Sequence, residues 1–325
     1  METRDFGRLG RISALTLGGG GIAGVWGSTD RAEAVATVHA ALDAGITMLD
    51  LAPAYGADFE SERAAGEALR TRPAPDLLIT SKVQLPDDQV DDVPGRIRSS
   101  LHHSLGLLGR EHLDLFLLHT HLGARDGSAV PADVVRWNVY RDEVVAEFER
   151  LRTEGLIRDW GITAVGRPDS VIAAFGETPR PAAAQVVVNA LDSNGDLWTF
   201  DPSVQPANDR IRRAANDNDV AVIGIRAVAA GSLTGALDRD LDPRHPAAAD
   251  FARAEPFREL AAEFGESTAA LAHRYALSVP GVATVVLGVK NRAELAECVA
   301  AEARGPLTPE ELDAVRASLR PSRAG

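Results

Sequence analysis

Residues 113–121 read Leu-Asp-Leu-Phe-Leu-Leu-His-Thr-His, and this stretch decides the fold class. Apart from Asp114, its first six residues are apolar without alternation, and polar side chains begin at His119. A run of this kind is typical of a strand buried on both faces, as in a parallel sheet covered by helices. Residues 77–83, Leu-Leu-Ile-Thr-Ser-Lys-Val, and residues 46–51, Ile-Thr-Met-Leu-Asp-Leu, have the same character. We therefore expect parallel strands whose carboxyl ends carry polar side chains.

Eight such runs occur along the chain, and helical patterns separate them. The expected strands cover residues 14–17, 46–51, 77–83, 113–119, 160–163, 185–189, 220–226 and 283–287, and the expected helices between them cover 31–44, 61–70, 94–108, 143–154, 168–174, 207–216 and 267–277. This alternation fits a (β/α)8 TIM barrel better than a doubly wound sheet. A hairpin around Gly7–Arg11 precedes the barrel, and helices over 292–303 and 309–319 close the chain. We expect residues 1–325 to form one α/β barrel domain.

Two connections, Thr120–Arg141 and Ala236–Phe257, are too long for plain turns. Loops of this length in a compact domain are usually functional lids or binding segments. We therefore expect these two segments to border a functional site.

Composition excludes several classes of protein. The chain has 325 residues, 45% of them hydrophobic, a net charge of -13 and a single cysteine, Cys298. The negative charge argues against a surface that follows nucleic-acid phosphates, and no apolar run approaches the roughly 18 residues of a membrane span. The first residues, Met-Glu-Thr-Arg-Asp-Phe-Gly-Arg, place charges where a signal peptide needs apolar residues. We expect a cytoplasmic protein with no nucleic-acid or membrane partner and no metal site.

Four polar side chains lie at or just beyond three successive strand ends. Asp50 ends the second expected strand, Tyr55 lies in the loop after it, Lys82 ends the third strand and His119 the fourth. The carboxyl ends of barrel strands meet at one rim, where active sites are built. Lys82 is one of only two lysines among 34 basic residues, and a lysine supplies a compact ammonium with a tunable pKa. A carboxylate, a phenol, an ammonium and an imidazole on one rim predict a catalytic site.

The stretches that carry these four residues resemble the aldo-keto reductase family, and the resemblance extends along essentially the whole chain. Gly45–Gly56 is similar to the family's first signature, Ile79–Val83 to its lysine motif and Asp114–His119 to its histidine motif. The resemblance implies the barrel fold and an oxidoreductase that transfers a hydride between a nicotinamide cofactor and a small-molecule carbonyl or alcohol.

The resemblance also implies that the four side chains form a catalytic tetrad. Tyr55 would give a proton to the carbonyl oxygen. Lys82 would favour the phenolate and so lower the pKa of Tyr55 from its usual value of about 10, while Asp50 keeps Lys82 charged and oriented. His119 would orient and polarise the substrate carbonyl.

Further residues are implied as contacts of the cofactor, although the G-x-G-x-x-G fingerprint of doubly wound folds is absent from the run Gly18–Gly21. Gly19 and Gly20 would line the nicotinamide ribose, and Thr163 and Gln185 would bind the carboxamide. The remaining implied contacts are Asp50, Ile225, Arg226, Val228, Ala229, Gly231, Leu233, Gly288, Lys290, Glu294, Glu297 and Cys298.

The expected cofactor is NADPH or NADP⁺, with NAD(H) as the alternative. Lys290 stands where the family places a residue near the adenosine 2′-phosphate. Glu294 would repel that phosphate, and Cys298 replaces an adenine-binding Asn. We expect the attraction of Lys290 for the phosphate to outweigh the repulsion by Glu294, because a phosphate near pH 7 carries up to two negative charges.

Two other functions stay open at this point. One is a non-catalytic barrel that senses a nicotinamide and regulates a partner, which the presence of His119 disfavours. The other is a Schiff-base lyase that uses Lys82 as its nucleophile. The substrate pocket is expected to include Trp26, Trp137 and Tyr140, although each of these aromatic side chains could equally pack in the core.

Overall fold

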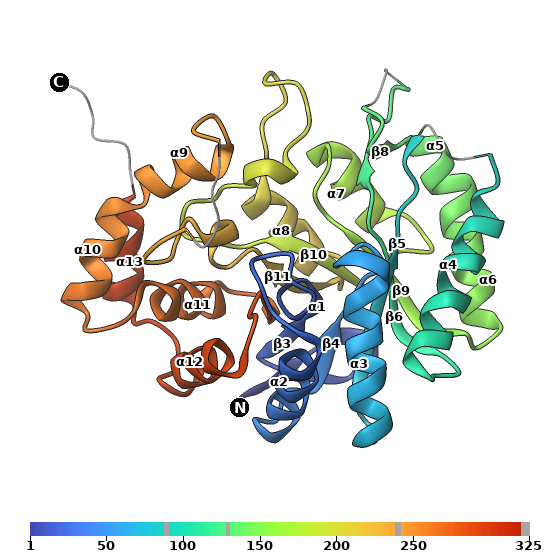
Figure 1. Ribbon diagram of the computed structural model, residues 1–325. Coiled ribbons are helices and arrows are strands. Elements are labelled where there is room, and N and C mark those ends of the chain that lie inside the picture. The colour runs from blue at the N-terminus through green and yellow to red at the C-terminus, as the bar shows by residue number, and fades with distance from the viewer. Residues whose placement is uncertain (88–90, 128–130, 238–241, 320–325) are drawn as a thin grey trace.

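The computed structural model describes residues 1–87, 91–127, 131–237 and 242–319, and a closed barrel of eight parallel strands forms its centre (Figure 1). The strands follow one another around the barrel in chain order, and pairing of the last strand with the first closes the ring. The expected (β/α)8 architecture is confirmed. The barrel strands are β3 (Leu15–Gly18), β4 (Met48–Asp50), β5 (Leu78–Val83), β6 (Leu113–Leu118), β9 (Ile157–Thr163), β10 (Ala183–Val187), β11 (Ala221–Ile225) and β12 (Val282–Leu287).

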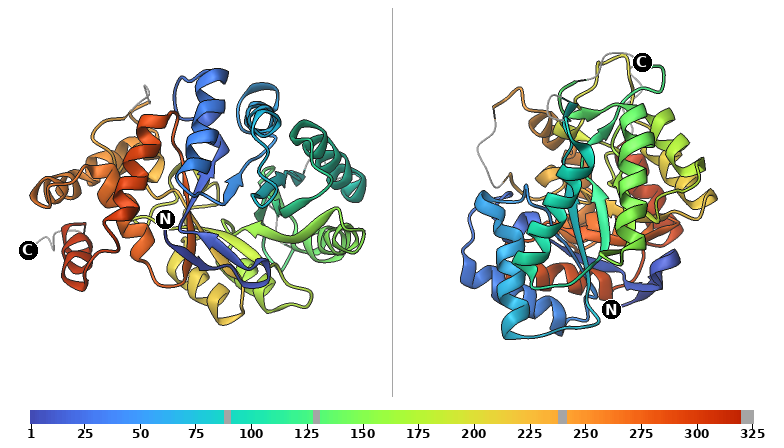
Figure 2. Two further views of the ribbon diagram at one scale, coloured as in Figure 1. Left: turned by 90° about the horizontal axis from the view of Figure 1, so that it is seen from below. Right: turned by 90° about the vertical axis from the view of Figure 1, so that its right-hand side faces the viewer.

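Helices surround the barrel, as the view from below shows (Figure 2). The α-helices are α1 (Gly19–Ile22), α2 (Arg31–Asp43), α3 (Glu60–Thr71), α4 (Val93–Leu108), α5 (Trp137–Val139), α6 (Val145–Thr153), α7 (Pro168–Gly176), α8 (Asn208–Asp217), α9 (Pro246–Arg253), α10 (Glu255–Glu263), α11 (Thr268–Ser278), α12 (Arg292–Ala303) and α13 (Pro309–Ser318). Short 3-10 turns are η1 (Gly7–Leu9), η2 (Ala57–Phe59), η5 (Gly195–Leu197) and η6 (Ala229–Gly231), and η4 (Tyr140–Val144) is a π-helical segment before α6.

The sequence encodes several of the helix ends. Asp30 begins α2 with its side chain accepting a hydrogen bond from the Glu33 N–H, and Thr308 and Glu311 form a reciprocal capping box at α13. Gly45, which follows α2, has a φ of +82°, a conformation that favours glycine. These local signals explain why the helix boundaries lie within a few residues of those expected.

The expected amino-terminal hairpin consists of β1 (Thr3–Asp5) and β2 (Arg11–Ser13), and it crosses the lower end of the barrel (Figure 2). Phe6 and Ile12 are buried in one cluster with Met48 of β4 and Leu117 of β6. Burying each large apolar side chain contributes roughly 1.5–3 kcal/mol. The hairpin therefore closes the amino end of the barrel and leaves the carboxyl rim for ligands.

The two long connections contain more regular structure than expected. The first includes β7 (His121–Leu122), which pairs with β8 (Val134–Val135), and then α5. The second includes α9, so Ala236–Phe257 is not a plain loop. Residues 128–130 and 238–241 of these connections lie outside the described residues.

Candidate active site

Three neighbouring strands bring three of the four predicted side chains to the carboxyl rim. Asp50 is the last residue of β4 and pairs with Thr80 of β5, while Lys82 lies two residues further along β5. His119 directly follows β6, and its N–H donates to the Val83 carbonyl oxygen over 2.8 Å. Because parallel strands in a barrel end on the same side, the register alone places these residues together.

Tyr55 reaches this rim from the loop between β4 and α3. Its backbone N–H donates to the Ala52 carbonyl oxygen over 3.1 Å, and its carbonyl oxygen accepts from the Ser61 N–H over 3.2 Å. The Ser61 hydroxyl also donates to the Ala52 carbonyl oxygen over 2.9 Å. The loop is thus tied to the start of α3, which holds the phenol over the barrel.

A buried ion pair lies beneath the phenol. Lys82 Nζ donates to Asp50 Oδ2 over 3.0 Å and to the Leu51 carbonyl oxygen over 2.7 Å. The Lys82 and Asp50 side chains are 0% and 2% exposed. Gln185 of β10 donates from Nε2 to the second carboxylate oxygen of Asp50 over 2.8 Å. Lys82 Nζ also lies 4.6 Å from the centroid of the Tyr55 ring, so one ammonium contacts both the carboxylate and the phenol.

The surroundings of Lys82 keep it protonated. Burial lowers the pKa of this amine, whereas the Asp50 carboxylate and the Tyr55 side chain raise it. The upward influences are together larger, so the pKa of Lys82 lies above its usual value. Burial raises the pKa of Asp50, against the influence of Lys82 and Gln185. We assign an ammonium and a carboxylate at neutral pH, because Asp50 accepts hydrogen bonds from both neighbours. A protonated amine is a poor nucleophile, which disfavours the Schiff-base lyase.

The pKa of Tyr55 departs from the expectation drawn from the sequence. Burial raises the pKa of the phenol, and the Lys82 ammonium and its hydrogen bond only partly oppose this. The expected net decrease is therefore wrong for the protein without ligands, because removing the phenolate from water outweighs one nearby positive charge. Tyr55 is a neutral phenol at neutral pH.

His119 is also neutral at neutral pH. Burial, the charge of Lys82 and the neighbouring His121 all hold its pKa well below the usual value. Its ring meets the Tyr55 ring edge-on, with 5.6 Å between the ring centroids. His119 Nδ1 is buried without a hydrogen-bond partner in the described parts of the chain. Because a buried N–H without an acceptor is rarer than a buried lone pair, we assign the proton to Nε2.

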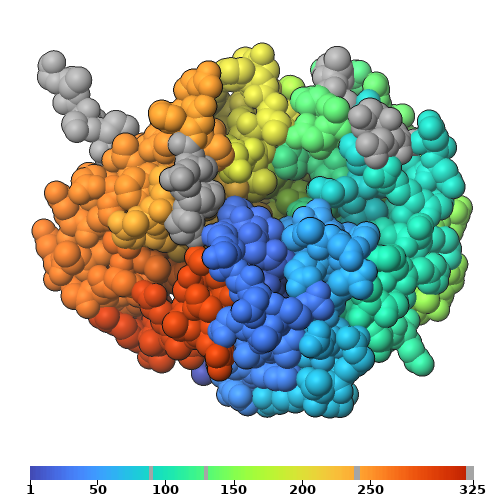
Figure 3. Space-filling view, in the orientation of Figure 1, coloured from blue at the N-terminus to red at the C-terminus, as the bar shows by residue number. Residues whose placement is uncertain are grey.

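A cavity of about 1270 Å³ opens above these groups. Its lining includes Tyr55, His119 and Asp50, and also Lys290 and Cys298. Figure 3 shows the surface hollowed at the top of the molecule, between the segments that follow β3, β6 and β10. A cavity larger than the usual 300–1,000 Å³ of small-molecule pockets has room for a dinucleotide together with a substrate.

A sequence model described as the Aldo/keto reductase family matches residues 14–320. This chain belongs to the aldo/keto reductase family.

Individual aldo/keto reductase relatives cover nearly all of the chain. L-galactose dehydrogenase of Arabidopsis thaliana is 26% identical over 99% of this chain and 95% of its own length. The structure of a glycerol dehydrogenase from Gluconobacter oxydans is 25% identical, covers 99% of this chain and 98% of its own, and has a TM-score of 0.71. The holo form of an aldo-keto reductase from Bacillus halodurans, at 22% identity, 100% and 99% coverage and a TM-score of 0.72, shows the same fold.

Most of the residues expected to contact the cofactor of this aldo/keto reductase line the cavity. They are Gly20, Asp50, Thr163, Gln185, Ile225, Arg226, Val228, Gly231, Gly288, Lys290, Glu294, Glu297 and Cys298. Three others do not line it. A side chain at Gly19 would approach Ser61 of α3 and Leu51 within about 3 Å, and Ala229 and Leu233 are buried in an outer cluster with Phe257. Packing against helices turns these three residues away from the cavity.

The expected substrate pocket is corrected at two of its three positions. Trp26 lines the cavity, and a side chain at Gly20 would come within 3.1 Å of its indole nitrogen. Trp137 and Tyr140 do not line it, because both are buried in the core between helices and strands, with 5.5 Å between their ring centroids. Helical segments at α5 and η4 turn these two aromatic side chains inward.

Arg226 is part of the wall of the cavity. Its guanidinium donates to the Asn194 carbonyl oxygen over 2.9 Å and pairs with Asp196 over 2.5 Å. Its φ of +59° is a left-handed conformation that most residues avoid. The geometry holds the segment after β10 against the segment after β11, so Arg226 shapes the cavity as well as lining it.

Lys290 forms an ion pair in the lining of the cavity. Its Nζ lies 2.9 Å from Glu294 Oε1, and its backbone N–H donates to Glu294 Oε2 over 2.8 Å. Nearby, Cys298 Sγ lies 3.8 Å from the ring nitrogens of His273. Burial raises the pKa of Cys298 to about 12, so this cysteine is a thiol and not a thiolate.

Sequence reasoning missed several polar residues of the cavity. His121, Asp133 and Asp196 line it, as do Gln84 and Arg96. Only His121 had a visible signal, since it follows the same strand end as His119. No group of three or more His, Cys, Asp or Glu side chains that could hold a metal ion occurs within the described ranges, nor is any helix there long and apolar enough to cross a membrane.

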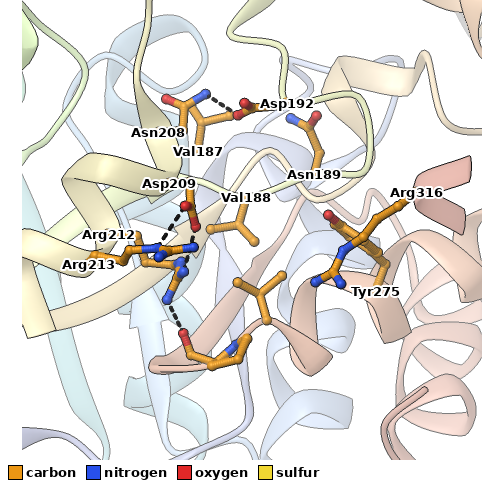
Figure 4. A pocket seen from close by; sticks show the side chains of 12 residues that line it. Val187, Val188, Asn189, Asp192, Asn208, Asp209, Arg212, Arg213, Tyr275 and Arg316 are labelled. Atoms are coloured by element: carbon orange, nitrogen blue, oxygen red, sulfur yellow. Dashed lines mark hydrogen bonds and ion pairs between the residues drawn. The ribbon is translucent and has the colours of Figure 1, made fainter. Parts of the chain in front are cut away.

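A second cavity of about 430 Å³ lies beside the end of β10, between α8, α11 and α13 (Figure 4). Its charged groups satisfy one another. Asp209 pairs with both Arg212 and Arg213, and Asn208 donates to Asp192 over 2.9 Å. This wall contrasts with the main cavity, where both His119 and His121 have a buried Nδ1 without a described partner.

Proposed function

We propose that this protein interconverts an aldehyde or ketone with its alcohol, using NADP(H) and with Tyr55 as the proton donor. The observation that carries the proposal is the Lys82–Asp50 ion pair buried beneath a neutral Tyr55, with His119 facing the same cavity. When bound, the nicotinamide supplies or accepts the hydride. The residues of this chain would manage the charge that develops on the substrate oxygen.

Tyr55 is suited to give its proton because it is uncharged at neutral pH. As the proton leaves, negative charge develops on the phenol oxygen, and the adjacent Lys82 ammonium stabilises that charge. Asp50 and the Leu51 carbonyl oxygen hold the ammonium in place. The dry, preorganised surroundings strengthen these interactions relative to water.

His119 would orient the carbonyl. A neutral imidazole with its proton on Nε2 donates one hydrogen bond, and it does not compete with Tyr55 for the role of acid. The edge-on contact with the Tyr55 ring fixes the two side chains relative to each other. Tyr55 and His119 can then both donate a hydrogen bond to the carbonyl oxygen of the substrate.

The cavity residues fit a nicotinamide cofactor. Thr163 and Gln185 offer a hydroxyl and an amide near Asp50, with 3.3 Å between Thr163 Oγ1 and Gln185 Oε1. Lys290, which carries a positive charge, and Cys298 line the same cavity. These features support carboxamide binding near the tetrad and adenosine binding near Cys298.

The preference for NADP(H) rests on Lys290. An ion pair as exposed as Lys290 and Glu294 contributes about 0–1 kcal/mol, whereas a charge-assisted bond to phosphate contributes about 1.5–3 kcal/mol. A 2′-phosphate can therefore replace Glu294 as the partner of Lys290 while the partly exposed carboxylate turns toward solvent. We propose a preference for NADP(H) of about tenfold.

The names of relatives suggest which substrates to try first. Besides L-galactose dehydrogenase, a D-threo-aldose 1-dehydrogenase of Pseudomonas is 25% identical over 68% of both chains. We propose small carbonyl or alcohol compounds as the substrates and a cytoplasmic site of action, the latter because the lone cysteine is a buried free thiol.

A panel of aldehydes, ketones, aldoses and polyols tests this function. Consumption of NADPH, or formation of NADPH from NADP⁺, is followed by absorbance with the purified protein. Turnover of at least one substrate class supports the proposal. No turnover, with tight cofactor binding, would favour a nicotinamide-sensing barrel, and an adduct trapped on Lys82 by borohydride would favour the lyase.

A further inference from the structure

A second imidazole lies beside the proposed tetrad, and the proposed reaction does not use it. His121 is the first residue of β7 and lines the same cavity as His119 and Tyr55. Two residues span at most roughly 7 Å of extended chain, so the two imidazoles are close neighbours on one rim. Each would therefore be within reach of a different part of a single small substrate.

The backbone around His121 is firmly held. The Thr120 hydroxyl oxygen accepts a hydrogen bond from the Leu85 N–H over 2.6 Å, and the Leu122 carbonyl oxygen accepts from the Arg167 N–H over 3.1 Å. β7 also pairs with β8, with His121 opposite Val134. This support on both sides is what a residue that orients a substrate needs.

The His121 ring is oriented by its neighbours. It stacks near Phe200, with 6.1 Å between ring centroids and 28° between ring planes, and Phe200 in turn packs against Trp198 at 5.0 Å. Its Nδ1 is buried without a hydrogen-bond partner among the described residues. By the argument used for His119, the proton of the neutral ring lies on Nε2, and the residue lines the cavity.

Asp133 completes the surroundings of His121. It directly precedes Val134, the residue that lies opposite His121 in the pairing of β7 with β8, and it lines the same cavity. An N–H donor beside a carboxylate acceptor matches a hydroxyl group, which accepts one hydrogen bond and donates another. A substrate carboxylate would be repelled by Asp133, and an alkyl chain would offer a hydrogen-bond partner to neither group.

We propose that His121, with Asp133, recognises a hydroxyl group on a substrate carbon other than the reacting one, and so selects polyhydroxylated aldehydes or ketones over alkyl ones. This inference rests on the proposed carbonyl reduction. His121 acts here as a specificity-determining residue, while the proton transfer stays with Tyr55.

The test compares hydroxylated and alkyl aldehydes of equal chain length. Glyceraldehyde is paired with propanal, and erythrose with butanal, and the ratio of kcat/KM within each pair is measured with NADPH. We expect the natural protein to favour the hydroxylated member by tenfold or more, because a site built to bind a hydroxyl rejects analogues that lack it. We expect His121→Phe, which keeps a flat ring against Phe200, to lower that ratio at least tenfold.

Two further variants make the outcome decisive. His121→Gln retains an N–H donor and should restore part of the ratio, and it also provides a measurement if His121→Phe folds poorly. His112→Phe makes the same exchange at the exposed opposite end of β6 and should leave the ratio unchanged. An unchanged ratio in a folded His121→Phe protein, or a natural protein that favours alkyl or carboxylated aldehydes, overturns the inference. Absence of turnover with every aldehyde, ketone, aldose and polyol would instead contradict the proposed function.

Discussion

Gln185 donates a hydrogen bond to Asp50 across the mouth of the barrel, with 2.8 Å between Gln185 Nε2 and Asp50 Oδ1. The two residues come from β10 and β4, which stand opposite each other in the closed strand order. Lys82 binds the other carboxylate oxygen from β5. Asp50 thus has both oxygens occupied by donors from distant parts of the chain, which explains how a carboxylate that is 2% exposed stays in place.

Removing the phenol hydroxyl tests the proton donor. We expect Tyr55→Phe to lower kcat/KM for carbonyl reduction by about 10²–10⁴-fold, the usual contribution of general acid catalysis. Cofactor binding, measured by quenching of protein fluorescence, should stay within a few-fold of the natural value. Turnover close to that of the natural protein would refute the assignment.

Removing Lys82 tests how much the buried ion pair with Asp50 contributes to activity and to stability. We expect Lys82→Met to abolish most activity and to lower the free energy of unfolding by about 3 kcal/mol, because Asp50 is left as a buried and unbalanced charge. Since burial raises the pKa of Asp50, the loss should shrink as the pH falls and that carboxylate becomes protonated.

Urea unfolding at several pH values measures this effect, and a double variant provides the control. Lys82→Met combined with Asp50→Asn removes both charges and should recover part of the lost stability. If Lys82→Met has natural stability and activity, the two side chains do not form the pair seen here.

The choice of cofactor depends on the balance between Lys290 and Glu294. We expect Glu294→Gln to raise the preference for NADP(H) over NAD(H), expressed as a ratio of Kd values, by about tenfold. The substitution removes the Glu294 carboxylate, which both pairs with Lys290 and repels the phosphate. Lys290→Ala should lower the same ratio. A natural preference for NAD(H) that neither variant alters would mean that the 2′-phosphate does not meet these residues.

The dependence on pH follows from the directions of two pKa values. Burial raises that of Tyr55, so its proton remains available until the pH exceeds the ordinary phenol value of about 10. Burial lowers that of His119 well below its usual value, so His119 stays neutral down to pH 6. We expect kcat/KM for reduction to be flat from about pH 6 to 9 and to fall only above that range. A midpoint near neutral pH in the reduction profile would show that Lys82 depresses the pKa of Tyr55 after all.

The barrel and the meeting of the four polar side chains at its rim are predictable from the order of residues along the chain. Unalternating apolar runs such as 113–118 predict strands covered on both faces, and parallel strands must end at one rim. Asp50, Lys82 and His119 were therefore predictable as neighbours from their positions at strand ends alone.

Other features depend on packing in three dimensions and are seen only in the folded chain. Trp137 and Tyr140 point into the core, because the helical segments of this long connection have a buried face that composition does not reveal. The pKa of Tyr55 is raised, because the effect of burial on the phenolate is larger than the opposite effect of the nearby Lys82 charge, and both depend on the folded surroundings. The hydrogen bond from Gln185 to Asp50 also belongs here, since a contact between opposite strands arises only when the ring closes.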